Sequence, residues 1–385
     1  MLLGINASRA RSGGARAHLI GILTEGDPIS HGFIEVHVWS YRELIDALPN
    51  PSWLIKHYPT ELERSMLRQL WWERFSLPKA LRRSGCDVLL NVDAGTVCRF
   101  HPAVTMSRDM LSYEQGEMQR FGWSKARMRL GLLRYMQNAS LRAATGAVFL
   151  TRYAAGVIQQ SCGALARVGL IPHGVGADFS DVVLTRPWPT NAKGPIRSLY
   201  VSNVAPYKHQ WYVVRAIRLL RDRGFDVQLT LTGGGNVDAL TKSQKWLDEE
   251  IELSDPKHLF VREVGYVRQS ELPSLLSEAD IFIFASSCEN MPNTLVEAMA
   301  AGLPIACSDR GPMPEVLEDG GVYFDPENPE SIAKAIEQII TNAELCMSIA
   351  RRAKELAGQY SWNRCAEETF AFIAETYRLK NDRNL

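Results

Sequence analysis

The chain has 385 residues, of which 46% are hydrophobic and 22% charged, and its formal net charge is zero. This composition excludes a disordered or fibrous chain and predicts a globular protein of two or three domains. The sequence predicts neither a membrane-spanning helix nor a signal peptide, since its longest apolar runs fall short of the ~18 residues that a span requires.

The cysteines and charges indicate the redox compartment and the kind of partner to expect. Seven cysteines are scattered without a C-x-x-C pair, which argues against a disulfide framework or a zinc site and favours a reducing cytosol. Residues 1–190 carry 22 basic and 15 acidic side chains, whereas 191–385 carry 21 and 28. This asymmetry predicts a polyanionic partner or a membrane surface for the basic half.

The first half alternates short apolar runs with helical patterns. Its predicted strands are Leu2–Ile5, Ile34–Trp39, Asp87–Asn91, Ala103–Met106, Ala147–Leu150 and Val168–Ile171. After the first strand, a loop containing Gly13 and Gly14 leads into a predicted helix, Ala15–Thr24. Such a loop can present backbone N–H groups to an anion.

A basic segment, residues 118–152, mixes Arg and Lys with Trp, Phe, Met and Leu, and no acidic residue occurs from 118 to 177. A basic amphipathic helix of this kind can lie on anionic lipid, so we expect peripheral contact with an anionic membrane. The alternative is a buried helix with an arginine-rich outer face. Nucleic acid is not an expected partner, because no recognition motif accompanies the charge.

The second half repeats the alternation more cleanly. Its predicted strands are Ile196–Ser202, Val227–Leu231, Leu259–Glu263, Ile281–Ala285 and Pro304–Ser308. Predicted helices between or after them are Trp211–Arg223, Val237–Glu252, Ser270–Ala279 and Thr294–Ala301, and a last helix covers about 361–385. Apolar strands separated by helices predict a parallel sheet covered on both faces.

A polar, Pro-rich connector, Leu184–Ser198, separates the two halves. We therefore expect an α/β protein with domains at 1–185 and 186–360, followed by the helix 361–385. Ligands of such sheets bind outside the carboxyl ends of the strands.

Several predicted strands of the second half end in residues that could contact a ligand. Lys208 follows the first strand, where it could reach an anion or simply be solvated. Gly234 lies in a glycine run, Thr232–Gly235, that would let the backbone approach a ligand. Asp-x-Asp, P-loop, His-Glu-x-x-His and Gly-x-Ser-x-Gly patterns are absent from the sequence, so Lys, Arg and helix N-termini would have to bind any phosphate.

The stretch Cys288–Gly302, CENMPNTLVEAMAAG, carries two carboxylates eight residues apart, Glu289 and Glu297. Taken alone, Thr294 and Glu297 fit a helix capping box that ends at Gly302, and Glu289 would be a solvated loop residue. The alternative is a ligand site built around a helix start.

The order of these pieces resembles glycosyltransferase family 4, a family of retaining, nucleotide-sugar-dependent enzymes with the GT-B fold. The matching motifs are Ser202-Asn203 with Lys208, Gly233–Gly235, Val264–Tyr266, the segment 286–316 and Gly321–Pro326. In the first half, Gly13-Gly14, Phe149–Tyr153 and Ile171–Val175 fit in outline. The resemblance implies two Rossmann-like domains facing across a cleft, with the C-terminal helix crossing back to the first.

The resemblance also implies roles for single residues. Glu289 would face the donor sugar, Glu297 would bind the ribose, and Asn293 and Thr294 would bind the diphosphate. Lys208 would neutralise the leaving diphosphate. Two further residues are implied: Tyr266 lies where the backbone holds the base, and Gly14 would approach the phosphate or sugar. Glu289 and Lys208 are the expected catalytic residues.

Three departures from the family pattern concern the donor. Asn203 stands where members often have an arginine, Asn290-Met291-Pro292 replaces Gly-Phe-Gly, and Arg108 stands where a histidine is common. We expect these residues to line the substrate site, with Arg108 supplying the missing positive charge.

The resemblance therefore predicts a retaining hexosyltransferase that needs no metal or other cofactor. It would use a nucleotide-diphosphate sugar and a glycan or lipid-linked acceptor in cell-surface polysaccharide synthesis, with lipopolysaccharide as one such product. Its expected location is the cytoplasm, at the inner face of the cell membrane. The alternatives are a GT-B sugar-nucleotide epimerase or a non-catalytic nucleotide-binding relative.

Overall fold

The computed structural model describes residues 1–11, 13–185, 194–233 and 242–382. It divides into two compact units, Met1–Gly174 with Ser361–Leu385, and Val175–Tyr360. The boundary expected at 185/186 was therefore placed too late. Helix α7 (Ala177–Ser180) packs on α11 (Asn293–Ala301), and the backbone N–H of Thr185 donates to the Ser277 carbonyl at 2.8 Å, so this segment belongs to the second unit.

The described part of the first unit contains a seven-stranded parallel sheet in the order β3-β2-β1-β4-β5-β6-β7. The strands are β1 (Leu2–Asn6), β2 (Glu35–Trp39), β3 (Leu54–His57), β4 (Val88–Asn91), β5 (Ala103–Met106), β6 (Gly146–Phe149) and β7 (Val168–Leu170). Six of them match predicted strands to within one residue at each end. The sequence missed β3, a short edge strand in which only Leu54 is buried.

The helices of this unit include one element from the far end of the chain. They are α1 (Gly13–Glu25), α2 (Arg42–Ala47), α3 (Met66–Trp71), α4 (Leu77–Arg83), α5 (Lys125–Ala143), α6 (Arg152–Cys162) and α15 (Trp362–Asp382). Shorter turns are η1 (Thr60–Glu63), the π-turn η2 (Trp72–Ser76) and η3 (Glu117–Phe121). Helix α15 packs on α1 at Gly21, where a Cβ atom would lie 2.4 Å from the Trp362 ring. Only glycine allows this close approach.

The described part of the second unit contains a six-stranded parallel sheet in the order β10-β9-β8-β11-β12-β13. The strands are β8 (Ile196–Val201), β9 (Val227–Thr232), β10 (Val261–Gly265), β11 (Ile281–Phe284), β12 (Ile305–Ser308) and β13 (Val322–Phe324). Strand β10 begins two residues later than predicted, because the Asp255 carboxylate accepts the backbone N–H groups of Leu259, Phe260 and Val261 at 2.8 Å each.

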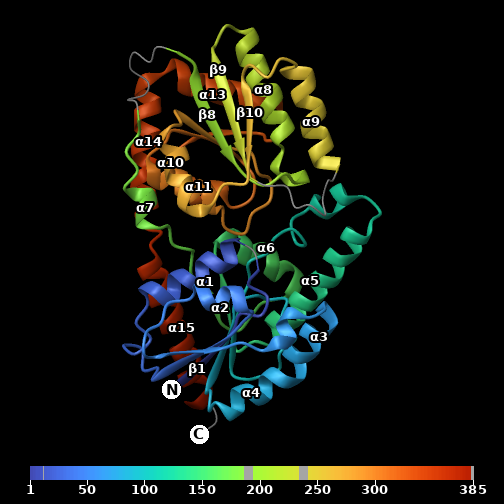
Figure 1. Ribbon diagram of the computed structural model, residues 1–385, viewed down its shortest axis with the longest axis vertical. Coiled ribbons are helices and arrows are strands. Elements are labelled where there is room, and N and C mark those ends of the chain that lie inside the picture. The colour runs from blue at the N-terminus through green and yellow to red at the C-terminus, as the bar shows by residue number, and fades with distance from the viewer. Residues whose placement is uncertain (12, 186–193, 234–241, 383–385) are drawn as a thin grey trace. The chain divides into compact units, whose positions relative to one another are not determined.

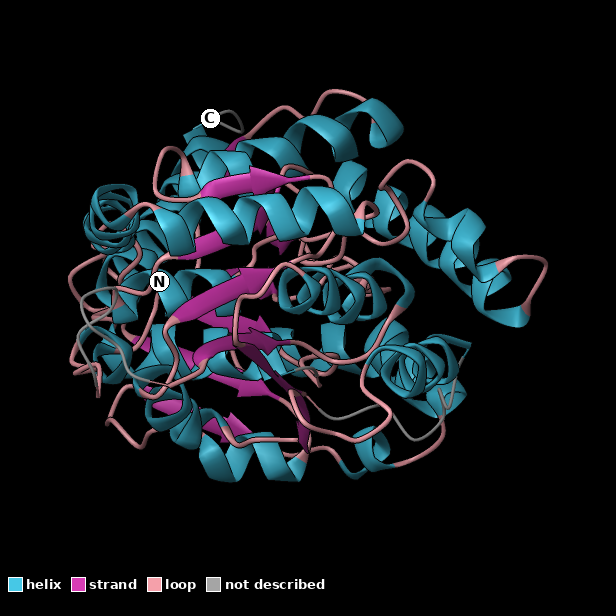
Figure 2. Ribbon diagram, turned by 90° about the horizontal axis from the view of Figure 1, so that it is seen from above, coloured by secondary structure: helices cyan, strands magenta, loops and turns pink. Residues whose placement is uncertain are grey.

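Helices pack in two groups around this sheet (Figure 1). One group consists of α8 (Gln210–Asp222), α9 (Lys242–Ser254) and α13 (Pro329–Thr341). The other includes α7, α10 (Leu272–Ser277), α11 and α14 (Ala343–Ala357). Smaller elements are α12 (Met313–Leu317), η4 (Pro206–Lys208) and η6 (Gln269–Glu271). Figure 2 shows strands lying between helices, which is the parallel α/β architecture that the sequence predicted.

The interior of each unit is apolar. The largest fully buried side chains include Phe33, Phe149 and Phe370 in the first unit and Tyr200, Phe282 and Phe284 in the second. Among the residues described, none of the helices combines the length and apolarity that a membrane span needs.

Candidate functional site

The candidate site of the second unit lies where the strand order of its sheet reverses. Strands β8 and β11 are neighbours there, and later strands are added on opposite sides of them. All pairings are parallel, so the loops after β8 and β11 leave the same edge of the sheet. Such a reversal is where open α/β sheets bind ligands, because the two loops diverge from it.

Lys208, after β8, and Glu289, after β11, meet at this edge. The Lys208 ammonium donates to the Glu289 carboxylate, and both side chains are largely enclosed, with 10% and 16% of their surfaces exposed. Lys208 is therefore not the solvated lysine of the alternative interpretation. It lies in the turn η4 rather than in the following helix.

A set of hydrogen bonds fixes the two loops against each other. The Ser287 backbone N–H donates to the Tyr207 carbonyl at 2.8 Å, and a ring nitrogen of His209 lies 2.9 Å from the Ser287 hydroxyl. The Tyr200 hydroxyl donates to the Lys208 carbonyl at 2.7 Å. His209 has a left-handed backbone with φ of 52°, which is costly for a residue other than glycine. The position of Lys208 is thus set by buried contacts.

Helix α11 begins beside this ion pair, but not by the predicted capping box. Pro292 is its N-cap residue and provides no side-chain cap. The Thr294 hydroxyl instead donates to the Val201 carbonyl at 3.3 Å, which ties the helix start to the end of β8. The predicted stop at Gly302 is confirmed, since this C-cap residue has φ of 76°. The positive end of the helix dipole, at Asn293 and Thr294, lies at the carboxyl edge of the sheet.

Glu297, one turn further along α11, is engaged outside its own helix. Its carboxylate accepts a hydrogen bond from the Gln269 side chain at 2.6 Å. Burial raises the pKa of Glu297 to about 7, and Asp178 of α7 adds to this rise, while the bond from Gln269 opposes it. A carboxyl group with this pKa can act as donor or acceptor near neutral pH.

The neighbouring strands β9 and β10 also end at this edge. The Gly233 backbone N–H and the Thr232 hydroxyl donate to the Gly265 carbonyl at 2.8 and 2.9 Å. Gly233 has φ of 135°, and a Cβ atom there would lie 2.1 Å from the Ser202 carbonyl oxygen. Tyr266 follows β10 and is 77% exposed. The predicted residue Gly234 lies outside the described residues.

The residues that depart from the family pattern differ in exposure. Asn290, Met291 and Pro292 are buried between Glu289 and α11, whereas Asn203 is exposed after β8. The second unit thus brings Lys208, Glu289, the start of α11 and the end of β8 to one edge. A cation, a helix N-terminus and the carboxylates of Glu289 and Glu297 in this arrangement can bind an anionic ligand that also carries hydroxyl groups.

Two further predicted residues, Gly14 and Arg108, belong to the first unit. The Arg108 guanidinium donates to the Gly14 carbonyl at 2.5 Å, and to ring nitrogens of His18 and His173 at 3.3 Å each. Burial lowers the pKa of Arg108 to about 10, although nearby Asp93 favours the charged form. Burial, with Arg108 and His173 adding to its effect, lowers the pKa of His18 well below its usual range.

These contacts bear on the expected role of Arg108. The guanidinium holds the first turn of α1 and donates a hydrogen bond to one ring nitrogen of each histidine. The two histidine rings stack with their centroids 4.6 Å apart. Because arginine can only donate hydrogen bonds, both of these histidine nitrogens must be unprotonated acceptors. The described contacts make Arg108 a clamp on the start of α1. Its proposed contact with a donor phosphate stays a prediction.

Sequence reasoning missed a buried carboxylate, Glu73, in the π-turn η2. Its oxygens accept hydrogen bonds from Asn6 at 2.8 Å, Thr96 at 2.6 Å and Arg9 at 3.1 Å, and its side chain is 2% exposed. Asn6 ends β1, so this cluster lies at the carboxyl edge of the first sheet. The sequence contained one sign of this buried carboxylate, because Glu73 is the single acidic residue in an otherwise apolar and basic segment.

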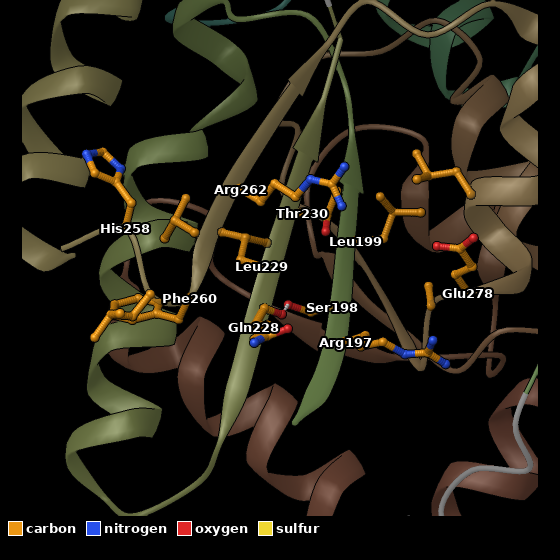
Figure 3. Close-up of a pocket in the computed structure, with 14 residues that line it drawn as sticks. Arg197, Ser198, Leu199, Gln228, Leu229, Thr230, His258, Phe260, Arg262 and Glu278 are labelled. Carbon is orange, nitrogen blue, oxygen red and sulfur yellow. Dashed lines mark hydrogen bonds between the residues drawn. The ribbon is translucent and has the colours of Figure 1, made fainter. Parts of the chain in front are cut away.

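A hollow of 480 Å³ in the second unit is separate from the candidate site (Figure 3). It is lined by residues 197–199 of β8, 228–230 of β9 and 258–262 at the start of β10, and by Leu275, Glu278 and Ala279 in and after α10. The ion pair and the start of α11 lie beyond the opposite ends of these parallel strands. This hollow therefore takes no part in the arrangement above.

Across the described ranges, no group of three or more His, Cys, Asp or Glu side chains could hold a metal ion. The expectation that the protein uses neither a metal nor another cofactor stays a prediction.

Comparisons with known proteins show what the second unit resembles in sequence. Residues 186–356 match the model of the family described as Glycosyl transferases group 1. O-antigen chain mannosyltransferase B from Escherichia coli is 28% identical over 175 residues, which cover 45% of this chain and 44% of that protein. The chain spans less than half the length of the curated relatives it matches.

Solved structures extend the likeness to the whole fold. Sucrose-phosphate synthase from Thermosynechococcus elongatus has a TM-score of 0.72 at 14% identity, covering 100% of both chains. HepE of Anabaena, solved with UDP and glucose, has a TM-score of 0.69 at 18% identity, covering 95% of this chain and 98% of that one. The predicted fold class, with two parallel-sheet α/β domains, is confirmed by the two described sheets and by these structural neighbours. Together the family match and the shared fold support placing this chain in the glycosyltransferase superfamily.

Proposed function

We propose that the protein is a retaining glycosyltransferase that moves a hexose-type sugar from a nucleotide-diphosphate sugar to a glycan or lipid-linked saccharide. The product would belong to cell-surface polysaccharide synthesis. The observation that carries the proposal is the largely enclosed pair of Lys208 and Glu289 beside the start of α11, at the strand-order reversal of a sheet in the family-matched segment. The name of the O-antigen relative and the UDP and glucose bound by HepE support the substrate class.

The donor would bind with its diphosphate at the start of α11. As the bond between sugar and phosphate breaks, negative charge develops on the leaving diphosphate and positive charge on the sugar carbon. Lys208 and the N-terminus of α11 would stabilise the phosphate charge because they are already fixed when it develops. Glu289 would orient Lys208 and contact the sugar, and Glu297 would bind the ribose hydroxyls.

The acceptor hydroxyl would attack from the side that the diphosphate leaves, and its proton would pass to the leaving phosphate oxygen. The sugar thereby keeps its configuration, and the reaction needs no separate protein base. The basic segment 118–152 would hold the protein at an anionic membrane surface on the cytoplasmic side, where a lipid-linked acceptor is within reach.

The first test is a thermal-shift screen with UDP-, GDP- and dTDP-linked sugars, because a ligand that binds only the folded state raises the melting temperature. Turnover of the stabilising donor is then measured with and without saccharide acceptors. We expect Lys208→Met and Glu289→Gln to lower turnover by at least about 100-fold. Lys245→Met, on the exposed face of α9, is the matched control and should leave turnover unchanged.

The same experiment separates the alternatives. An epimerase would convert the donor to an isomeric nucleotide sugar without an acceptor. A non-catalytic relative would bind a nucleotide sugar and leave it intact with every acceptor. A donor that binds equally well to Lys208→Met and wild type would contradict the assignment of this lysine to the diphosphate.

A further inference from the structure

A helix of the first unit exposes an apolar face that the fold does not cover. Four side chains of α3 and the following π-turn form it, which we call the α3 face: Met66, Leu67, Trp71 and Phe75. They are 57%, 79%, 60% and 49% exposed. The Trp71 and Phe75 rings lie 5.7 Å apart, so the two aromatic side chains form one contiguous patch. Contiguous exposed aromatic groups on a soluble unit mark a contact surface.

The charges around the α3 face are mostly basic, although Glu61 and Glu63 of η1, which packs on α3, are acidic. From Arg64 to Arg83 the sequence carries six basic residues and one acidic residue, Glu73. Arg64, Arg68 and Arg74 are exposed, and the Arg74 guanidinium lies 5.4 Å from the Phe75 ring centroid. Glu73 does not offset this charge at the surface, because it is buried and paired with Arg9. From Arg64 onward the exposed apolar and charged groups of this segment are aromatic, aliphatic and cationic, which complements an anionic lipid surface.

The inward side of the same turn explains how such a face could be held rigidly. While Trp71 and Phe75 face outward, Glu73 points into the unit and accepts hydrogen bonds from Asn6 and Thr96. Trp72 is also buried. The α3 face is therefore mounted on the carboxyl edge of the first sheet and not on a loose segment, so little conformational entropy would be lost on docking.

A second exposed apolar stripe occurs on helix α5 of the same unit. Met128, Leu132 and Tyr135, spaced at about one helical turn, are 77%, 62% and 72% exposed, and Trp123 just before the helix is 98% exposed. No acidic residue lies between 118 and 177. Both helices are labelled in Figure 1. Two separate basic segments with exposed aromatic side chains are more easily explained by an extended lipid surface than by a single protein partner.

We propose that the α3 face is an interfacial membrane anchor. Its leucine and aromatic side chains would enter the boundary between headgroups and acyl chains, where tryptophan is favoured, and the flanking arginines would bind lipid phosphates. The bound partner is an anionic bilayer. This inference adds a second anchor to the segment 118–152 and does not depend on the reaction, because lipid binding is measured without turnover.

The test is co-sedimentation of the full chain with vesicles. Wild type should bind vesicles of phosphatidylcholine with phosphatidylglycerol, bind phosphatidylcholine alone more weakly, and lose affinity as salt is raised. Leu67→Glu and Trp71→Glu should each lower the affinity by about tenfold or more, since each removes an apolar anchor and adds a repelled charge. Arg74→Glu should weaken binding to the anionic vesicles and have a smaller effect on neutral ones.

Leu253→Glu is the matched control, because Leu253 is a similarly exposed leucine, at 73%, on helix α9 of the second unit. It should bind the vesicles as wild type does. Circular dichroism melts of all variants check folding, and Phe75→Ser replaces any glutamate variant that unfolds. Wild type that does not bind anionic vesicles, or Leu67→Glu and Trp71→Glu variants that bind as wild type does, would overturn the proposal. So would a wild-type dimer that Trp71→Glu converts to a monomer without lipid, since the α3 face would then be a protein interface.

Discussion

Replacing Glu297 by glutamine tests the environment of α11 through pH. The pKa of this carboxyl is raised to about 7 from an ordinary value of 4.5, mainly by burial. The folded state therefore binds the proton more tightly than the unfolded state does. Its contribution to stability is present below about pH 4.5 and is lost as pH rises through about 7.

The size of the effect follows from this difference in pKa. At roughly 1.4 kcal/mol per pKa unit, ionised Glu297 would cost the folded state up to about 3 kcal/mol at pH 8. Part of the side chain is open to solvent, so screening reduces the expected cost to about 1–2 kcal/mol. Glutamine keeps the oxygen that accepts the Gln269 hydrogen bond but cannot ionise.

We therefore expect the free energy of unfolding of Glu297→Gln to exceed that of wild type by about 1–2 kcal/mol at pH 8, so the variant unfolds at a higher denaturant concentration. At pH 5 the difference should be much smaller. Urea unfolding of both proteins at the two pH values measures this. Glu278→Gln, at an exposed position after α10, is the control and should change stability equally at both. A gain for Glu297→Gln that is the same at pH 5 and pH 8, or a loss at both, would refute the reasoning.

Three further predictions concern packing and the ion pair, each measured by urea unfolding. Lys208→Met or Glu289→Gln alone should lower the free energy of unfolding by about 3 kcal/mol, because each leaves a largely enclosed charge unpaired. The double variant should lose less stability than the sum of the two single variants, and additive losses would contradict the pairing. Gly233→Ala should cost about 2 kcal/mol or more, because the added Cβ meets a backbone carbonyl at 2.1 Å. The control Gly224→Ala, at φ of 94° with open space around it, should cost about 1 kcal/mol; equal losses would show that the clash is relieved. Phe370→Ala should destabilise the first unit by about 3–5 kcal/mol, since its side chain is fully buried on α15; a loss under 1 kcal/mol would argue that α15 is not part of that unit's core.

The sequence by itself determined the local elements and the class of fold. Buried parallel strands are short apolar runs, so most of them could be located to within a residue or two, and the helix stop at Gly302 followed from its conformational freedom. Strand β3 was not predicted, because an edge strand buries few side chains and therefore has a weak apolar pattern. The order of motifs indicated the superfamily, since each motif lies at a strand end.

Only the tertiary structure decided which residues meet. Glu289 pairs with Lys208, 81 positions away, and Glu297 with Gln269, 28 positions away, because parallel strands bring distant loops to one edge. The capping box predicted for Thr294 and Glu297 failed for the same reason: both side chains have partners outside the helix, which local sequence cannot reveal. Arg108, Glu73 and the segment 175–185 likewise depend on contacts between distant parts of the chain. A side chain's partners are set by packing, and packing is a property of the whole fold.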